Sequence, residues 1–178
     1  MLLDQAILER LSPVSATADF DCGNPDLNEF LIKDALHYQD QLLGVTYLFR
    51  SIKAKEALAY FTVLNDGIKA TNNLNRRIPN QKRHGKIPAV KIGRLAVSMP
   101  QQGAKLGSQV LDFIKYWFSI NNKTGCRFLL ADAYNKPETI AFYQRNGFSF
   151  LTNDSGKETR AMKFDLKPYE MRMAKADS

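Results

Sequence analysis

The chain has 178 residues, of which 44% are hydrophobic and 24% are charged. This composition is ordinary for a globular domain and excludes a disordered or collagen-like chain. The two cysteines, Cys22 and Cys126, are too few for a disulfide framework or a zinc site. No apolar run is long enough for a signal peptide or a membrane span, so we expect a cytoplasmic protein.

The net charge of +7 is concentrated in one part of the sequence. From Gly67 to Leu111 there is no acidic residue, whereas the same stretch carries nine lysines and arginines. Such a block is typical either of a solvated surface loop or of a surface that attracts phosphates.

The first predicted elements are an edge strand at 7–12 and a helix that begins near Asn24. Asn24 suits the N-cap position and Pro25 the first helical position, where a missing amide hydrogen removes no helical bond. We expect Gly44 to end this helix.

The remaining elements follow from β-branched and aromatic runs, helical periodicity and turn residues. In chain order they are strands at 45–52 and 57–65, a basic loop at 67–88, a strand at 89–97, a helix at 106–120, a strand at 126–133, a helix at 137–146 and a closing hairpin at 148–152 and 159–166. This order predicts a mixed α/β sheet with at least one β-α-β crossover. We expect a single domain at 1–166 and a disordered C-terminal tail at 167–178.

The junction between the strand at 89–97 and the helix at 106–120 carries the most informative short motif. Gly103 and Gly107 lie where the helix begins, in the run VSMPQQGAKLGSQVL. A helix start exposes unpaired amides and the positive end of the helix dipole, and glycine lets the backbone approach an anion closely. The junction is therefore either a plain turn or a site for a pyrophosphate.

The run GRLAVSMPQQGAKLGSQVLDFI at 93–114, followed by AFYQRNGF at 141–148, resembles the GNAT superfamily of N-acetyltransferases. The resemblance covers about residues 20–166. It implies an α/β (α+β) fold with a mixed, mostly antiparallel sheet of six to seven strands and helices on both faces. It also implies acetyl-coenzyme A as the cofactor.

The family's cofactor loop has the form [QR]-x-x-G-x-[GA], and Gln102 and Gly107 match its first and last residues. Its middle glycine is Lys105 here, and a lysine tolerates a positive φ poorly. The resemblance implies that the loop backbone binds the pyrophosphate and that the end of the preceding strand binds the pantetheine and the acetyl carbonyl. Asn135 is adjacent to the position where the family often has an asparagine. The implied cofactor residues are Leu95, Ala96, Val97, Gln102, Gly103, Ala104, Lys105, Leu106, Gly107, Ser108 and Asn135.

The resemblance places Tyr143 where the family often has a tyrosine next to the cofactor sulfur, so we expect it to act as the general acid. A buried core aromatic is the alternative for a tyrosine on a short amphipathic helix. No general base stands out, although Asp66 and Asp132 are carboxylates at or in predicted strands. We predict no metal site.

Two further runs, FDCGNPDLNEFL at 20–31 and IPAVKIGRLAV at 87–97, look like the acetyltransferase toxins of toxin–antitoxin pairs. In that branch the acceptor is the amino group of an aminoacyl-tRNA, and the antitoxin carries a ribbon-helix-helix DNA-binding part. The basic block would then contact tRNA phosphates. The residues we expect to do so are Arg76, Arg77, Lys82 and Arg83.

The interpretation we favour from the sequence is an acetyl-CoA-dependent N-acetyltransferase that acts on a primary amine of a small molecule or protein by direct attack. It would be an acyltransferase whose acyl group is not an aminoacyl group. The toxin that modifies aminoacyl-tRNA is the first alternative, and a non-catalytic sensor that binds acyl-CoA or nucleic acid is the second. The partner in the favoured interpretation is the unidentified amine. In the toxin interpretation the partners are aminoacyl-tRNA and an antitoxin. A homodimer is a further expectation, and we expect no membrane partner.

Overall fold

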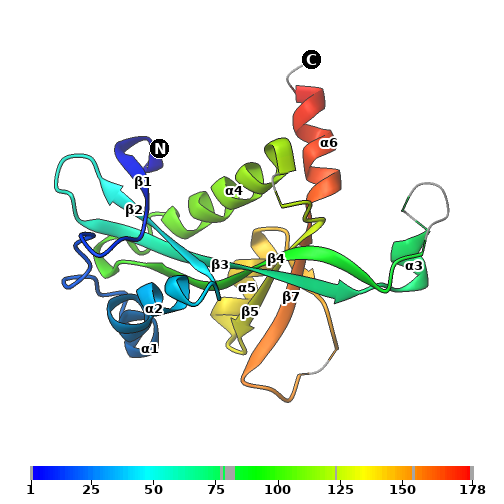
Figure 1. Cartoon of the computed structure of the whole chain (residues 1–178), viewed down its shortest axis with the longest axis horizontal. Helices are drawn as coiled ribbons and strands as arrows, with labels where there is room; N and C mark the ends of the chain where they lie inside the picture. The colour runs from blue at the N-terminus through cyan, green and yellow to red at the C-terminus, as the bar shows by residue number, and fades with distance from the viewer. Residues whose placement is uncertain (1, 77, 79–82, 123, 154, 177–178) are drawn as a thin grey trace. The chain divides into compact units, whose positions relative to one another are not determined.

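The computed structural model describes residues 2–76, 78, 83–122, 124–153 and 155–176 (Figure 1). Seven strands form one sheet in the order β1-β2-β3-β4-β5-β7-β6. Their bounds are Ala6–Arg10 (β1), Val45–Ser51 (β2), Ala57–Lys69 (β3), Lys86–Val97 (β4), Phe128–Tyr134 (β5), Ser149–Phe150 (β6) and Thr159–Asp165 (β7). The pairs β1–β2, β2–β3, β5–β7 and β6–β7 are antiparallel. The predicted mixed, mostly antiparallel sheet is confirmed.

Helices separate the strands largely in the predicted order. They are α1 (Pro25–Glu29), a π-helical segment (Phe30–Asp34), α2 (Ala35–Asp40), α3 (Asn72–Asn75), α4 (Leu106–Ser119), α5 (Pro137–Arg145) and α6 (Leu166–Ala176). Short 3-10 turns lie at Leu2–Gln5, Met99–Gln101 and Ile120–Asn122. In the described part of the chain, no helix is long and apolar enough to cross a membrane.

The chain divides into two compact units, each made of two segments. The first unit is Met1–Leu64 with Ile92–Ile114, and the second is Asn65–Lys91 with Lys115–Ser178. Strands β3 and β4 therefore each contribute to both units. The single domain expected at 1–166 stays a prediction.

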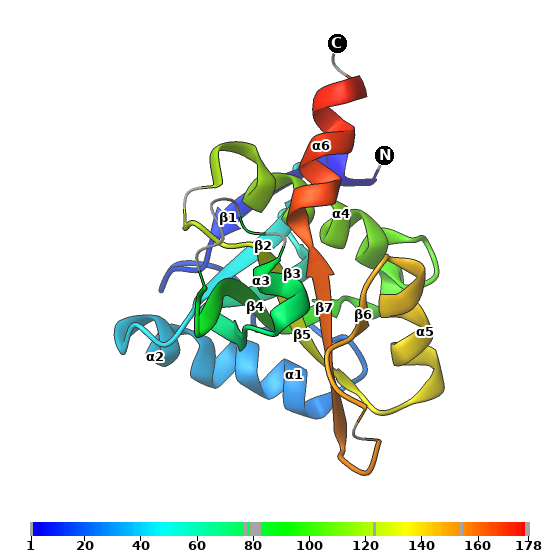
Figure 2. The same cartoon turned by 90° about the vertical axis from the view of Figure 1, so that its right-hand side faces the viewer.

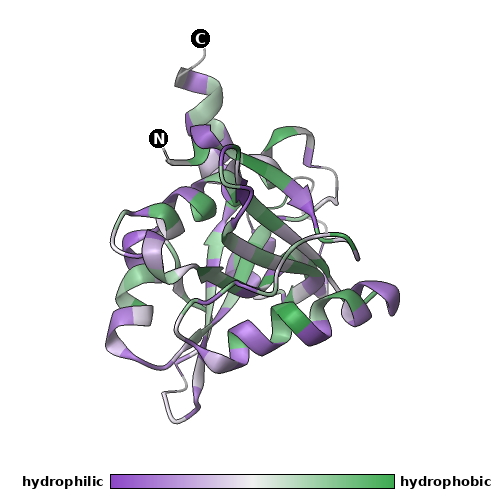
Figure 3. Ribbon diagram, turned by 90° about the vertical axis from the view of Figure 1, so that its left-hand side faces the viewer, coloured by the Kyte–Doolittle hydropathy of each residue, from purple (hydrophilic) through white to green (hydrophobic). Residues whose placement is uncertain are grey.

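The first unit packs apolar side chains on both faces of β2 and β3. On one face, Leu48 and Tyr60 belong to a core cluster that also contains Leu11, Phe20, Phe30, Leu31, Ala35 and Ala96. On the other face, the rings of Phe49 and Phe61 contact Phe113 of α4, with centroids 5.2 and 6.4 Å apart. Successive strand residues point to opposite faces, so helices cover this part of the sheet on both sides. Figure 3 shows apolar residues concentrated in the strands, whereas the helices carry both polar and apolar residues.

The first helix begins as predicted, because the Asn24 side chain accepts hydrogen bonds from the amides of Asp26 (3.0 Å) and Leu27 (3.4 Å). Its middle is wider than an α-helix, since the amide of Ala35 donates to the carbonyl of Phe30 five residues earlier.

The expectation that Gly44 ends this helix is wrong. The helix ends at Asp40, and the left-handed residue that follows it is Leu42, with φ of +58°. The amide of Leu43 then donates to the carbonyl of Tyr38 at 2.9 Å, which closes the end of the helix. Gly44 instead allows the backbone to lie close to β3, because a Cβ at this position would lie 3.3 Å from Cγ2 of Thr62.

The second unit has its own core around β5, formed by Ile68, Ile87, Ala89, Phe128 and Leu130. Helix α5 ends as predicted at Gly147, which has φ of +83°, and the amide of Phe148 donates to the carbonyl of Tyr143 at 3.0 Å.

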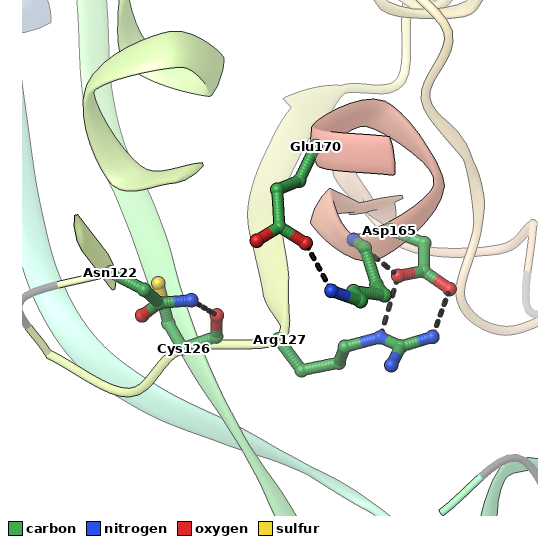
Figure 4. A network of polar contacts seen from close by, with 6 residues as sticks. Asn122, Cys126, Arg127, Asp165 and Glu170 are labelled. Carbon is green, nitrogen blue, oxygen red and sulfur yellow. Dashed lines mark hydrogen bonds and ion pairs between the residues drawn. The ribbon is translucent and has the colours of Figure 1, made fainter. Parts of the chain in front are cut away.

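Two segments of the second unit are more regular than expected. The predicted loop at 67–88 contains the end of β3, helix α3 and the start of β4. The predicted disordered tail at 167–178 is helical through Ala176, and α6 follows directly from β7 (Figure 2). Asp165 caps this helix, because its carboxylate accepts a hydrogen bond from the amide of Lys167 at 3.1 Å. The same carboxylate is held by Arg127, whose Nε and Nη2 donate at 2.7 and 3.1 Å (Figure 4).

Candidate functional site

The loop between β4 and α4, which we call the β4–α4 loop, places unpaired backbone donors in a row. Gly103 and Lys105 both have positive φ, at +80° and +61°. The amides from Gly103 to Gly107 donate no hydrogen bond to any residue that the structure describes. They stand at the beginning of a helix of 14 residues, so the positive end of its dipole adds to them. The amide of Ser108, also predicted to face the pyrophosphate, instead donates to the carbonyl of Lys105 at 3.1 Å.

The chain's own residues therefore fit a ligand with a diphosphate. Five successive amides without protein acceptors need hydrogen-bond acceptors from outside the chain, which an anion or water can supply. Lys105 adopts a left-handed conformation, which costs roughly 1 kcal/mol for a residue with a Cβ and which a glycine would adopt more readily.

Gln102, predicted as a cofactor residue, uses its side-chain amide to close the β4–α4 loop. Its Nε2 donates to the carbonyl of Val97 at 3.0 Å and to the carbonyl of Cys22 at 2.9 Å. A second bond to the same N-terminal segment runs from the amide of Met99 to the carbonyl of Asp21 at 2.8 Å. The β4–α4 loop is therefore fastened to residues about 80 positions away in sequence.

The N-terminal segment at 21–28 is itself held by a small polar cluster. The Asp21 carboxylate accepts hydrogen bonds from the Gly23 amide and from Nδ2 of Asn28, both at 2.7 Å, and these bonds lower its pKa. Oδ1 of Asn28 accepts from the amide and from the thiol of Cys22, at 2.9 and 3.0 Å. Burial is the main reason that the pKa of the Cys22 thiol is raised, so this thiol is a hydrogen-bond donor rather than a nucleophile.

The end of β4 carries the three residues predicted to bind pantetheine and the acetyl carbonyl. Ala96 is buried in the core of the first unit, whereas Leu95 and Val97 are half-buried. Beside them, the guanidinium of Arg94 lies over the ring of Phe30 at 4.8 Å from its centroid. Its Nε is buried and has no hydrogen-bond partner among the described residues. Arg94 is one of the nine cations between Gly67 and Leu111, and nothing in the sequence distinguishes it from the others.

Tyr143 lies on α5 in the second unit, with 8% of its surface exposed. The rings of Phe142 and Phe148 contact it edge to face, each with centroids 5.3 Å away. Burial first, and the nearby charge of Asp132 second, raise the pKa of Tyr143 well above its ordinary value. Its hydroxyl makes no hydrogen bond to the part of the chain that the structure describes. The group therefore keeps its proton, which is the state that a general acid requires.

The remaining polar candidates are engaged elsewhere in the second unit. Asp132 is exposed and forms an ion pair with Lys91, and the exposed Asp66 accepts a hydrogen bond from the adjacent Gly67 amide. The side-chain amide of Asn135, predicted as a cofactor contact, donates to the carbonyls of Ser155 and Lys157, both at 2.9 Å. Asn135 thus holds the segment before β7. Within the described residues, no group of three or more His, Cys, Asp or Glu side chains is arranged to hold a metal ion.

The basic block is divided between the two units. Lys91 is ion-paired, and Arg94 and Lys105 belong to the first unit. Arg76 and Arg83 are exposed and line a hollow of about 260 Å³ beside α3, where Nη1 of Arg83 donates to Oδ1 of Asn72 at 3.1 Å. Arg77 and Lys82, also predicted to contact nucleic acid, lie outside the described residues.

Comparisons with known proteins identify what the chain resembles. No protein-family model matches it. It is 26% identical over 149 residues to a tRNA-acetylating toxin of Mycobacterium tuberculosis, covering 82% of this chain and 85% of that protein.

Solved structures that share the fold at low identity include two complexes of AtaT. AtaT complexed with acetyl-methionyl-tRNAfMet matches with a TM-score of 0.79 and 22% identity, over 94% of this chain and 99% of that one. A tyrosine-to-phenylalanine mutant of AtaT, bound to the C-terminus of the antitoxin AtaR and acetyl-CoA, matches with a TM-score of 0.74 and 22% identity, over 96% and 99%.

The GNAT-like fold and the resemblance to the toxin-type branch are confirmed by these matches. The preference in the sequence analysis for a small-molecule or protein amine as the acceptor is wrong. The finding that overturns it is the match over 82% of the chain to a tRNA-acetylating toxin, together with the likeness to AtaT complexed with acetyl-methionyl-tRNAfMet.

Proposed function

We propose that this chain, with its GNAT-like fold and its resemblance to toxin-type acetyltransferases, transfers an acetyl group from acetyl-CoA to the amino group of an aminoacyl-tRNA. The observation that carries the cofactor half of the proposal is the row of five unpaired amides from Gly103 to Gly107 at the start of α4. The acceptor half is supported by the likeness to the tRNA-acetylating toxin over 82% of the chain.

Each part of the chain has a distinct role in this proposal. The β4–α4 loop binds the diphosphate through its amides, and the Lys105 ammonium adds a positive charge. Backbone amides of Leu95 to Val97 donate to the carbonyl oxygen as it gains negative charge. When bound, acetyl-CoA supplies the activated acetyl thioester.

Tyr143 is the proposed general acid, and its hydroxyl proton goes to the departing thiolate. A coenzyme A thiol has a pKa near that of cysteine, about 8.5. Such a thiolate is a much weaker base than a tyrosinate with a raised pKa. Transfer to a free thiolate would be unfavourable, so we expect the proton to move while the C–S bond breaks. The attacking nitrogen releases a proton to solvent as the amide forms, and a proton from solvent restores the tyrosine. The α-amino group of an aminoacyl ester is less basic than a lysine, so a neutral nucleophile is available without a dedicated base.

The proposal includes a protein partner, an antitoxin with a ribbon-helix-helix DNA-binding part. The likeness to AtaT bound to the C-terminus of its antitoxin supports a protein partner, and the class of antitoxin rests on the sequence resemblance alone.

The direct test is to incubate the purified chain with radiolabelled acetyl-CoA and a panel of aminoacyl-tRNAs. We expect label on the aminoacyl group of at least one tRNA, and none on the same tRNA after its amino acid has been removed. Free amino acids, polyamines and lysine peptides serve as competing acceptors. Labelling of these amines with equal or higher kcat/KM than aminoacyl-tRNA would contradict the proposal.

A further inference from the structure

The net positive charge of the chain belongs to the second unit. Counted from the sequence, the first unit has seven lysines and arginines against ten acidic residues, a net charge of −3. The second unit has 18 against eight, a net charge of +10. An excess of this size attracts polyanions and is not needed for folding.

A groove of about 730 Å³ lies within this second unit. We call it the α3–α6 groove, because residues of α3, β6, β7 and α6 line it together with the end of β3. Its cations are Lys69 at the end of β3, Lys163 on β7 and Arg172 on α6. Figure 2 looks onto the side of this unit that carries α3, with β7 and α6 also in view.

The three cations of the groove have no carboxylate partner among the described residues. The acidic residue that lines the groove, Asp165, is already held by both Nε and Nη2 of Arg127, as Figure 4 shows. The groove therefore presents uncompensated positive charge, and neutralising it requires an anion from outside the chain.

Helix α3 joins this groove to a second positive hollow. Thr71, Asn73 and Leu74 line the α3–α6 groove, whereas Asn72, Asn75 and two arginines line the smaller hollow on the same helix. The cations available along this track are Lys69, Arg76, Arg83, Lys163 and Arg172. They come from two segments of the sequence, 69–83 and 163–172, so no short motif contains them together.

We propose that the α3–α6 groove binds the sugar-phosphate backbone of RNA. This inference rests on the proposed function, because it names the surface of the chain that holds the RNA part of the acceptor. Exposed Lys69 and Arg172 and half-buried Lys163, interleaved with hydroxyl and amide side chains, suit phosphates, which accept from all of these donors. Among its apolar residues, Ile68, Phe128 and Phe164 are only 4%, 2% and 8% exposed, whereas Leu74 and Leu151 are half-buried and Pro168 is exposed. An acidic protein segment is therefore the competing occupant, and the polyglutamate arm of the test separates it from RNA.

The test compares two double variants that remove the same charge. In the full chain, Lys69 and Lys163 are replaced by Gln in one variant, and Lys53 and Lys55, which are exposed in the first unit, in the other. Binding of a fluorescent, uncharged tRNA is measured between 50 and 200 mM salt. The groove variant should bind roughly tenfold more weakly, and its slope of log K against log salt should fall by about 1 for each lysine removed. The control variant should keep the parental affinity and slope.

A third variant and two competing polyanions, duplex DNA and polyglutamate, test whether the groove is specific for RNA. Arg172→Gln, on the exposed face of α6, replaces the double variant if the latter fails to fold, as judged by circular dichroism. Equal losses in the groove and control variants would overturn the proposal, and so would tighter binding of a DNA duplex of the same sequence. Unchanged RNA binding with lost binding of a polyglutamate peptide would make the groove a protein-docking surface. Because uncharged tRNA accepts no acetyl group, RNA binding is tested independently of the proposed reaction.

Discussion

The side-chain amide of Gln102 donates to the backbone carbonyl of Cys22 at 2.9 Å, across 80 positions of sequence. The same nitrogen donates to the carbonyl of Val97 at 3.0 Å, so one side chain fixes the β4–α4 loop both to the strand before it and to the N-terminal segment.

Replacing Gln102 with Ala should lower the free energy of unfolding by about 1 kcal/mol, because two hydrogen bonds at an exposed site are lost. It should also weaken acetyl-CoA binding several-fold, since the loop amides are then less well ordered before binding. Urea denaturation and calorimetric titration measure the two effects. Gln101→Ala is the matched control, and comparable losses in that variant would show that loop order does not depend on the Gln102 contacts.

Lys105→Gly should stabilise the free protein by about 0.5 kcal/mol, because relief of the left-handed conformation slightly exceeds the entropy that glycine adds to the unfolded chain. The same change should weaken acetyl-CoA binding about threefold by removing an ammonium near the diphosphate. Lys55→Gly is the control, since Lys55 has nearly the same φ, +58°, in a turn of the first unit. It should give the stability gain with unchanged cofactor affinity. A higher affinity in Lys105→Gly would mean that the lysine hinders binding.

Tyr143→Phe should lower kcat about 100-fold, the usual contribution of a positioned general acid, with little change in the dissociation constant of acetyl-CoA. Stability should change little, because the hydroxyl has no hydrogen-bond partner among the described residues. Tyr116→Phe, on the exposed side of α4, is the control for loss of a phenol. Equal kcat in the Tyr143→Phe variant and the parent would remove this residue from the mechanism.

The raised pKa of Tyr143 also predicts a pH dependence of stability. Its folded-state pKa lies above that of an unfolded tyrosine, about 10, so the folded state holds this proton where the unfolded state releases it. The stability that results is fully present below pH 10 and falls as the pH rises above that value. Denaturant titrations at pH 9, 10 and 11 should show a steeper decline for the parent than for Tyr143→Phe. Parallel declines would mean that the hydroxyl is not buried in solution.

Asp165→Ala should lower the free energy of unfolding by about 2 kcal/mol, because it removes a bidentate partner of Arg127 and the cap of α6 together. Loss of helical signal in the far-ultraviolet circular dichroism should accompany it. Glu170→Ala removes an exposed ion pair with Lys167 on the same helix and should change stability by less than about 0.5 kcal/mol. If both variants lose the same stability, the cap is not what orders α6.

Local chemistry made much of the fold predictable. Asn24 and Gly147 act where the sequence places them, because a cap depends on the residue and its immediate neighbours. Leu42 was missed because a leucine has no intrinsic preference for positive φ. Helix α6 was missed although Asp165 caps it locally, and the same carboxylate is also bound by Arg127, 38 residues earlier.

The candidate site shows the same division. The β4–α4 loop was visible in the spacing of Gly103 and Gly107, and its backbone amides do remain unpaired. The hydrogen bonds of the Gln102 and Asn135 side chains could not be predicted, because their acceptors are backbone carbonyls that are distant in sequence. The α3–α6 groove was not visible at all, since Lys69, Lys163 and Arg172 meet only after the sheet has formed.

The wide turn at Phe30–Asp34 has a consequence for changes of chain length. Deleting one residue there would restore regular helical hydrogen bonding, yet it would swing the following turns around the helix axis by about 100°. Gln39 would then lose its two anchors, the carbonyl of Leu11 at 3.0 Å and the amide of Thr46 at 2.9 Å. The extra residue in the π-helical turn thus rotates α2 so that the Gln39 side chain reaches Leu11 and Thr46. A regular helix that is one residue shorter would turn this side chain away from both.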